Sequence, residues 1–231
     1  MKILLWDIDG TILDFLAAEK AAIKSLFLDF GIGECTDRMI EEYSEINKEY
    51  WKKLERGEMS KPDILRRRFE DFFSLIGASA DAEAFNSAYQ IRLGDTIVFI
   101  DEANLLLERL KKKGYKQYAV TNGTRIAQRN KLSKGGLYPL FDDVFISEEV
   151  GAEKPSREFF DAVLESIGHP DLSEIMIIGD SLTSDIKGGR NAGITTCYFN
   201  REYSLSSPDV DIEIHSLYEL EKILLSHEAK S

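Results

Sequence analysis

The sequence predicts an α/β fold with a parallel sheet, helices on both of its faces and an inserted segment that is helical throughout. Three observations support this prediction. Short apolar runs alternate with helical patterns of about 10–15 residues, which indicates right-handed crossovers between parallel strands. The run at 175–178 is apolar at every position, as expected for a strand buried on both faces. Residues 15–95 show one helical pattern after another, with no strand between them.

The expected strands are short apolar runs that lie beside turn residues. They are 3–6, 117–120, 144–146, 175–178 and 195–199, and a last strand and helix should follow a surface loop at 201–211. Helical patterns lie between or beside the strands at about 101–113, 125–134, 156–168 and 184–192. These elements predict a Rossmann-like core, in which ligands bind outside the carboxyl ends of the strands.

The inserted segment is expected to form a separate helical domain. Its helical patterns lie at 17–30, 37–55, 61–76 and 81–92. Ser60, with Pro62 just beyond it, marks a helix start, and glycines such as Gly77 mark helix ends. We therefore expect a discontinuous core at 1–14 and 96–231 and a helical cap at 15–95. Because the cap follows the first strand, we expect it to act as a lid over the site that this strand builds.

Composition narrows the classes of function. The chain has 231 residues, with 29 basic and 41 acidic side chains and a formal net charge of −12. A surface this acidic repels polyanions, so we expect no nucleic-acid partner. The apolar runs fall far short of the roughly 18 residues needed to span a bilayer, and the first run is too short for a signal peptide. We expect a cytoplasmic protein with no membrane partner, in which Cys35 and Cys197 form no disulfide framework.

The first chemical signal is the pair Asp7 and Asp9, which directly follows the first strand. Two carboxylates that leave a strand two residues apart can point into one crevice. This pair suits a nucleophile with a general acid, or metal ligation. An Asp-x-Asp-Gly sequence also forms turns and calcium loops. A calcium loop, however, needs a bidentate Glu further on, and no Glu is placed at that spacing.

Three further signals fall near later strand ends. Thr121-Asn122-Gly123 offers a hydroxyl, a side-chain amide and backbone N–H groups at a helix start, an arrangement that can bind an anion. Lys154 precedes a helix that opens after Pro155, and Asp180 follows the strand at 175–178, with Asp185 five residues later. Each signal alone is typical of a turn or a helix cap. Their order along successive strand ends indicates a common site.

The order of these motifs resembles the haloacid dehalogenase-like hydrolase superfamily, over the whole predicted core. The matching residues are Asp7, Asp9 and Thr11, then Thr121, then Lys154, then Gly179-Asp180 with Asp185. The helical insertion resembles the type-one cap of that superfamily. The resemblance implies a Rossmann-like phosphatase core that uses Mg²⁺, with Mn²⁺ as a substitute, and a small phosphorylated metabolite as substrate.

The resemblance also implies a role for each matching residue. Asp7 would attack phosphorus, and Asp9 would protonate the leaving alcohol and later deprotonate the attacking water. Thr121 and the amides of Asn122 and Gly123 would hold phosphoryl oxygens, together with Thr11, and Lys154 would neutralise charge. Asp7, the Asp9 carbonyl, Asp180 and Asp185 would hold the metal, Asp185 indirectly or by orienting Lys154. Relatives that displace halide typically lack the second acid, so Asp9 favours a phosphatase or a phosphomutase over a dehalogenase.

The predicted cap resembles that of the noncanonical pyrimidine 5′-nucleotidase subfamily. The matching segments are 46–51 with Asn47 and Trp51, Glu55-x-Gly57, and Arg67-Arg68-Phe69. One departure is Gly10, where that subfamily often has Asp, Glu or Asn. The resemblance implies 5′-dephosphorylation of nucleotides such as dUMP, dTMP or UMP. Trp51 could stack on a base and Asn47 could bind a pyrimidine edge, although a tryptophan in the cap core and a surface asparagine are also compatible with the pattern.

Two alternatives to a nucleotidase are compatible with the sequence. A phosphatase of phosphoglycolate or a sugar phosphate would keep the same catalytic residues and differ in the cap. A non-catalytic module that binds a phosphorylated ligand would be expected to have lost Asp7, Asp9 or Lys154, and all three are present.

Overall fold

The computed structural model describes residues 2–203 and 209–226, so the middle of the predicted loop at 201–211 lies outside the described residues. The chain forms two compact units. The sheet unit comprises residues up to Asp14, Val98–Arg125 and the residues from Gly135 onward. The helical unit comprises Phe15–Ile97 together with Ile126–Lys134, and thus includes a segment distant in sequence from the predicted cap at 15–95.

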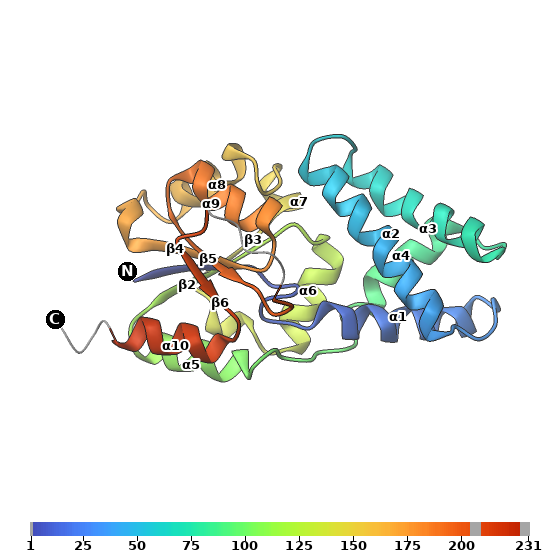
Figure 1. Cartoon of the computed structure of the whole chain (residues 1–231), viewed down its shortest axis with the longest axis horizontal. Coiled ribbons are helices and arrows are strands. Elements are labelled where there is room, and N and C mark those ends of the chain that lie inside the picture. Colours follow the sequence, from blue (N-terminus) through green and yellow to red (C-terminus); the bar gives the residue numbers. More distant parts are fainter. Residues whose placement is uncertain (1, 204–208, 227–231) are drawn as a thin grey trace. The chain divides into compact units, whose positions relative to one another are not determined.

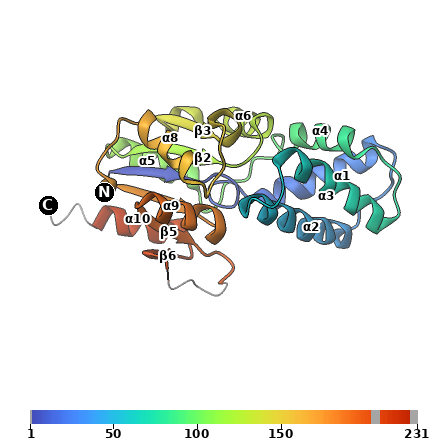
Figure 2. The same ribbon diagram turned by 90° about the horizontal axis from the view of Figure 1, so that it is seen from above.

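The sheet unit contains a six-stranded parallel sheet in the order β3-β2-β1-β4-β5-β6 (Figure 2). The strands are β1 Ile3–Trp6, β2 Lys116–Thr121, β3 Asp143–Ile146, β4 Ile175–Gly179, β5 Thr195–Phe199 and β6 Ile212–Ile214. Helices α5 (Ala103–Lys112) and α10 (Leu217–Ser226) lie on one face, and α8 (Arg157–Ser166) and α9 (Lys187–Ala192) lie on the other (Figure 1). The predicted α/β fold with a parallel sheet and helices on both faces is confirmed.

The register of the sheet places the chemical motifs together at the carboxyl ends of its strands. Trp6, the last residue of β1, pairs with Ala119 of β2 and with Ile178 of β4. The residues that follow these positions therefore emerge together at the carboxyl ends of the three central strands. All five residues of β4 are buried, as its continuous apolar sequence predicts for a strand covered on both faces.

The helical unit contains four long helices. They are α1 Phe15–Asp29, α2 Asp37–Glu55, α3 Lys61–Ile76 and α4 Ala82–Arg92. Ser60 caps α3, because its side chain accepts a hydrogen bond from the Asp63 N–H, and Gly77 ends α3 in the left-handed conformation. Buried aromatic side chains from all four helices form its core, among them Phe27, Tyr43, Phe69, Phe72, Phe85 and Tyr89.

Helix α6 (Arg125–Lys134) provides the second segment of the helical unit. Its Lys131 ammonium lies 5.1 Å from the centre of the Phe15 ring, and Lys134 forms an ion pair with Asp95. A β-carbon added to Gly94 would collide with the Asn130 side chain, so this glycine allows α6 to approach closely. These tertiary contacts, rather than any local pattern, group 126–134 with the helical unit.

The remaining elements include one difference from the sequence prediction. The helix expected at 184–192 is divided into a π-helical turn at Leu182–Ile186 and the short helix α9. The Ser181 carbonyl accepts hydrogen bonds from both Asp185 and Ile186, which widens this first turn. A short helix, α7 (Ser147–Val150), follows β3. Both cysteines are buried and free, and no helix within the described residues has the length and apolarity to cross a membrane.

Candidate active site

Asp7 is the central residue of the site, at the carboxyl end of β1. Its residue is 7% exposed, and each carboxylate oxygen accepts one hydrogen bond. The Thr11 hydroxyl donates to Oδ2 at 3.2 Å, and the Lys154 ammonium donates to Oδ1 at 2.8 Å. The turn that returns Thr11 to Asp7 is closed by the Ile12 and Leu13 N–H groups, which both donate to the Ile8 carbonyl. The carboxylate is thus held in one orientation beside a cation.

Lys154 is buried, with 1% of its surface exposed, and its ammonium has three protein partners. These are Asp7 Oδ1 at 2.8 Å, Asp185 Oδ1 at 2.7 Å and the Val120 carbonyl at 2.8 Å. An ammonium group has three N–H donors, so these partners match its capacity. Burial disfavours the charged form, but Asp185 and Asp7 outweigh burial and hold the pKa of Lys154 above its ordinary value.

Three carboxylates form an acidic cluster next to the ammonium. One oxygen each from Asp7, Asp180 and Asp185 lies within 4.8 Å of the other two. Asp180 follows β4 directly, and the Asp185 Oδ2 accepts the Ser181 N–H at 3.1 Å. Carboxylate oxygens are the ligands that Mg²⁺ and Ca²⁺ prefer, so the donor set fits a hard divalent cation. Within the described residues Asp9 does not belong to this cluster: it lies half-buried in the turn after β1.

Two carboxylates of the cluster carry the pKa shifts expected of crowded acids. Burial raises the pKa of Asp7 to about 7; Lys154 opposes the shift, and Asp185 and Asp9 add to it. Asp180 is exposed at the edge of the cluster, yet the atoms around its carboxylate displace water. This desolvation, followed by the charges of Asp7 and Asp185, raises the pKa of Asp180 well above its ordinary value. A bound cation would relieve this repulsion.

Two glycines make room for the acidic cluster. A β-carbon on Gly10, whose φ is +94°, would collide with the Asp180 carboxylate. A β-carbon on Gly179 would likewise collide with the carboxylate of Asp185. Gly10, at a position where the nucleotidase subfamily often has a larger residue, accommodates both this positive φ and the close approach of Asp180.

The loop after β2 differs in detail from the anion site expected at Thr121-Asn122-Gly123. The Thr121 hydroxyl accepts the Gly123 N–H at 3.0 Å and can donate its own proton to an anion. The Asn122 side chain instead bonds to the backbone of Lys154, with Nδ2 donating to the Lys154 carbonyl and Oδ1 accepting the Lys154 N–H, both at 2.8 Å. At the start of α6, the Arg125 N–H donates to Glu148, a contact that the sequence did not indicate.

The predicted cap residues Asn47 and Trp51 lie on α2, in the helical unit. Asn47 is only 3% exposed, because its Nδ2 donates to Glu19 Oε2 at 2.8 Å and its Oδ1 accepts from Arg68 Nη1 at 2.6 Å. Trp51 is half-buried against the cluster formed by Tyr50, Leu54 and Ile64. Sequence reasoning did not predict the Glu19–Asn47–Arg68 network, whose members come from α1, α2 and α3.

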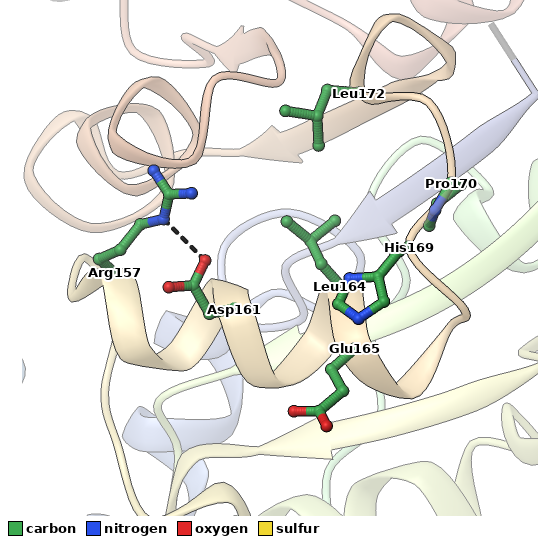
Figure 3. Close-up of a pocket in the computed structure, with 7 residues that line it drawn as sticks. All are labelled: Arg157, Asp161, Leu164, Glu165, His169, Pro170 and Leu172. Carbon is green, nitrogen blue, oxygen red and sulfur yellow. Dashed lines mark hydrogen bonds and ion pairs between the residues drawn. The ribbon is translucent and has the colours of Figure 1, made fainter.

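A surface pocket of about 390 Å³ lies elsewhere in the sheet unit, along α8 and the segment after it (Figure 3). Its lining residues are Arg157, Asp161, Leu164, Glu165, His169, Pro170 and Leu172. The Arg157 guanidinium pairs with Asp161 at 2.7 Å, so the cation on this wall is already neutralised. None of the predicted site residues lines this pocket.

Comparison with known proteins identifies a family with which this chain shares sequence and structure. A family model described as haloacid dehalogenase-like hydrolase matches residues 1–193. The chain is 38% identical to the HAD-hydrolase YfnB of Bacillus subtilis, covering 96% of this chain and 95% of the relative. A crystal structure of YfnB bound to magnesium superimposes with a TM-score of 0.90 over 96% of this chain and 98% of that structure.

Two further relatives are named for a substrate class. The pyrimidine 5′-nucleotidase PynA of Streptococcus pneumoniae is 37% identical over 86% of this chain and 84% of its own length. The pyrimidine 5′-nucleotidase YjjG of Escherichia coli is 30% identical over 97% of this chain and 98% of its own length.

Proposed function

The chain belongs to the haloacid dehalogenase-like hydrolase family, and on that premise we propose that it is a Mg²⁺-dependent phosphatase of pyrimidine nucleoside monophosphates. It is a hydrolase whose relatives include two pyrimidine 5′-nucleotidases that align over most of the chain. The substrates we propose are dUMP, dTMP and UMP. The observation that supports a phosphatase best is Asp7, a carboxylate oriented by Thr11 and Lys154 beside two further carboxylates.

We propose a reaction in two displacements at phosphorus. A carboxylate oxygen of Asp7 attacks, the bond from phosphorus to the nucleoside oxygen breaks, and Asp9 gives its proton to that oxygen. Asp9 then removes a proton from a water molecule, which attacks the aspartyl phosphate and releases inorganic phosphate and the Asp7 carboxylate. Lys154 limits the repulsion between Asp7 and the incoming phosphate, and the Thr121 hydroxyl is placed to donate to a phosphoryl oxygen.

The acidic cluster is the proposed metal site. Asp7, Asp180 and the Asp9 backbone carbonyl would hold Mg²⁺, and Asp185 would act on it indirectly while it orients Lys154, as its 2.7 Å hydrogen bond to the ammonium suggests. When bound, the cation would offset the charge of the phosphate and of the carboxylates around it. The raised pKa values of Asp7 and Asp180 fit a site in which the Lys154 ammonium alone does not neutralise the carboxylates.

Substrate choice is assigned to the helical unit. Trp51 is the proposed stacking residue for the base, since it is an aromatic residue that is only half-buried and stacking contributes about 1–3 kcal/mol. Asn47, which is buried and engaged by Glu19 and Arg68, would support α2 rather than contact the base in this conformation.

The test is phosphate release with Mg²⁺ from dUMP, dTMP, UMP, AMP, phosphoglycolate and ribose 5-phosphate, with Asp7→Asn as the blank. Preference for the pyrimidine nucleotides would support the proposal. Preference for phosphoglycolate or the sugar phosphate would keep the catalytic assignments and overturn the substrate. Release from none of them, with the protein folded, would favour a module that binds a phosphorylated ligand without hydrolysing it.

A further inference from the structure

We infer that Asn122 is a positioning residue that fixes Lys154, and that it does not contact the substrate through its side chain. This inference rests on the proposed function, in which Lys154 stabilises charge beside Asp7. The Asn122 amide makes two hydrogen bonds with one residue: Nδ2 donates to the Lys154 carbonyl, and Oδ1 accepts the Lys154 N–H, each at 2.8 Å.

The pair of hydrogen bonds requires an amide side chain. A side-chain amide carries a donor and an acceptor side by side, so it can pair with the N–H and C=O of one residue as a neighbouring strand does. Asn122 is 9% exposed and Lys154 is 1% exposed, so water is largely excluded from both groups. Removal of the amide would leave a buried N–H and a buried C=O without these partners, which is costly in a dry environment.

Both ends of Lys154 are held by the end of one strand. Asn122 pairs with its backbone, while its ammonium donates to the carbonyl of Val120, two residues earlier in the chain. Val120 of β2 and Asn122, just after β2, therefore fix the positions of the Lys154 ammonium and the Lys154 backbone, respectively. The ammonium reaches Asp7 and Asp185 from this fixed position. Such preorganisation matters because a misplacement of about 1 Å can cost on the order of 100-fold in rate.

These hydrogen bonds give Asn122 a different role from that of its neighbour Thr121. The Asn122 oxygen and one of its N–H groups face the Lys154 backbone, and its Nδ2 also lies 3.5 Å from the Ser184 hydroxyl. The Thr121 hydroxyl, which accepts from Gly123, still has its own proton to donate. The Thr121 hydroxyl is then the side-chain donor of this loop that can reach an anion, and the Asn122 side chain instead positions Lys154.

The test compares Asn122→Ala with Gln117→Ala. Gln117 lies near the start of β2, the strand that Asn122 follows; it is fully buried, and its Nε2 donates to the Leu107 carbonyl at 2.8 Å. Both variants lose a buried amide that bonds to backbone. We expect both to lower the midpoint of urea unfolding, whereas only Asn122→Ala lowers kcat, by about 10- to 100-fold with KM changed less than about threefold.

A second readout does not depend on turnover. The side-chain ¹⁵Nζ resonance of Lys154, assigned by its absence in Lys154→Arg, should shift or broaden in Asn122→Ala and stay in place in Gln117→Ala. An unchanged kcat in folded Asn122→Ala, an unchanged Nζ resonance, or a rise in KM that accounts for the whole loss of kcat/KM would each overturn the inference. If Asn122→Ala does not fold, Asn122→Ser provides the same comparison. If the wild type hydrolyses none of the substrates, the proposed function fails while the resonance still tests the positioning.

Discussion

Lys154 Nζ lies 2.8 Å from Asp7 Oδ1, although the two residues are 147 positions apart in the chain. The contact exists because β1 pairs with β2 and β2 pairs with β3, so that the end of β1 and the segment that follows β3 and α7 lie at the same end of the sheet. The pair is buried on both sides, with side-chain exposures of 1% and 10%. Removal of either partner of such a buried ion pair leaves the other charge buried without compensation, which destabilises the fold.

Removal of the buried Lys154 ammonium should destabilise the protein more than removal of a surface ammonium group. We expect Lys154→Met to lower the free energy of unfolding by about 3–5 kcal/mol at neutral pH, because Asp7 and Asp185 lose their shared buried partner. Lys116→Met is the matched control: the Lys116 side chain is 62% exposed, so solvent screens its pair with Asp142 and its loss should cost far less. Urea unfolding measures both. Equal losses in the two variants would contradict the prediction.

The pKa of Asp7 predicts how stability depends on pH in metal-free protein. Because burial raises this pKa to about 7, the folded protein binds more protons than the unfolded chain between about pH 4 and pH 7. The free energy of unfolding should therefore fall as pH rises through this window and level off above about pH 7. Urea unfolding with EDTA at a series of pH values measures the slope, which Asp7→Asn should reduce.

The role of Asp9 can be tested through the leaving group. Asp9→Asn should lower kcat on the preferred nucleotide by about 100- to 10,000-fold, the range typical of a lost general acid. With p-nitrophenyl phosphate, whose leaving group needs little protonation, the loss in the first step should be smaller. Single-turnover rates for the two substrates give the comparison. Full phosphate release by Asp9→Asn from the nucleotide would exclude Asp9 as the acid.

Glu19, a buried carboxylate of the helical unit, should make a separate contribution to the pH dependence of stability. Burial raises the pKa of Glu19 despite hydrogen bonds from Ser44, Tyr89 and Asn47. The folded unit therefore retains this proton at pH values where the unfolded chain has lost it, and stability should fall as pH rises above about 4.5. Glu19→Gln should remove this slope, and the exposed Glu165→Gln should leave it in place; thermal unfolding across pH compares them.

Trp51→Ala should separate base recognition from phosphate chemistry. Loss of a stacking contact of about 1–3 kcal/mol should raise KM for dUMP by about 5- to 150-fold. KM for ribose 5-phosphate, which has no base, should change little. Steady-state kinetics with both substrates gives the result. An unchanged KM for dUMP would assign Trp51 to the cluster with Tyr50, Leu54 and Ile64 alone.

Much of the fold could be predicted because its signals are local. The bounds of α2 and α3 agree with the sequence prediction, since caps such as Ser60 and Gly77 act within one turn of the helix that they begin or end. The continuous apolar run of β4 likewise indicates a strand buried on both faces. The parallel sheet then brings Asp7, Thr121 and Asp180 to one edge, because parallel strands end together.

The order of residues along the chain establishes which chemical groups follow the strands, whereas tertiary packing sets the partners that these groups contact. Asn122 bonds to the backbone of Lys154, 32 residues away, and Asn47 bonds to Glu19, 28 residues away. Helix α6 joins the helical unit through Asn130, Lys131 and Lys134. A hydrogen bond needs its two atoms within about 3 Å, and only the packed chain sets that distance between residues far apart in sequence.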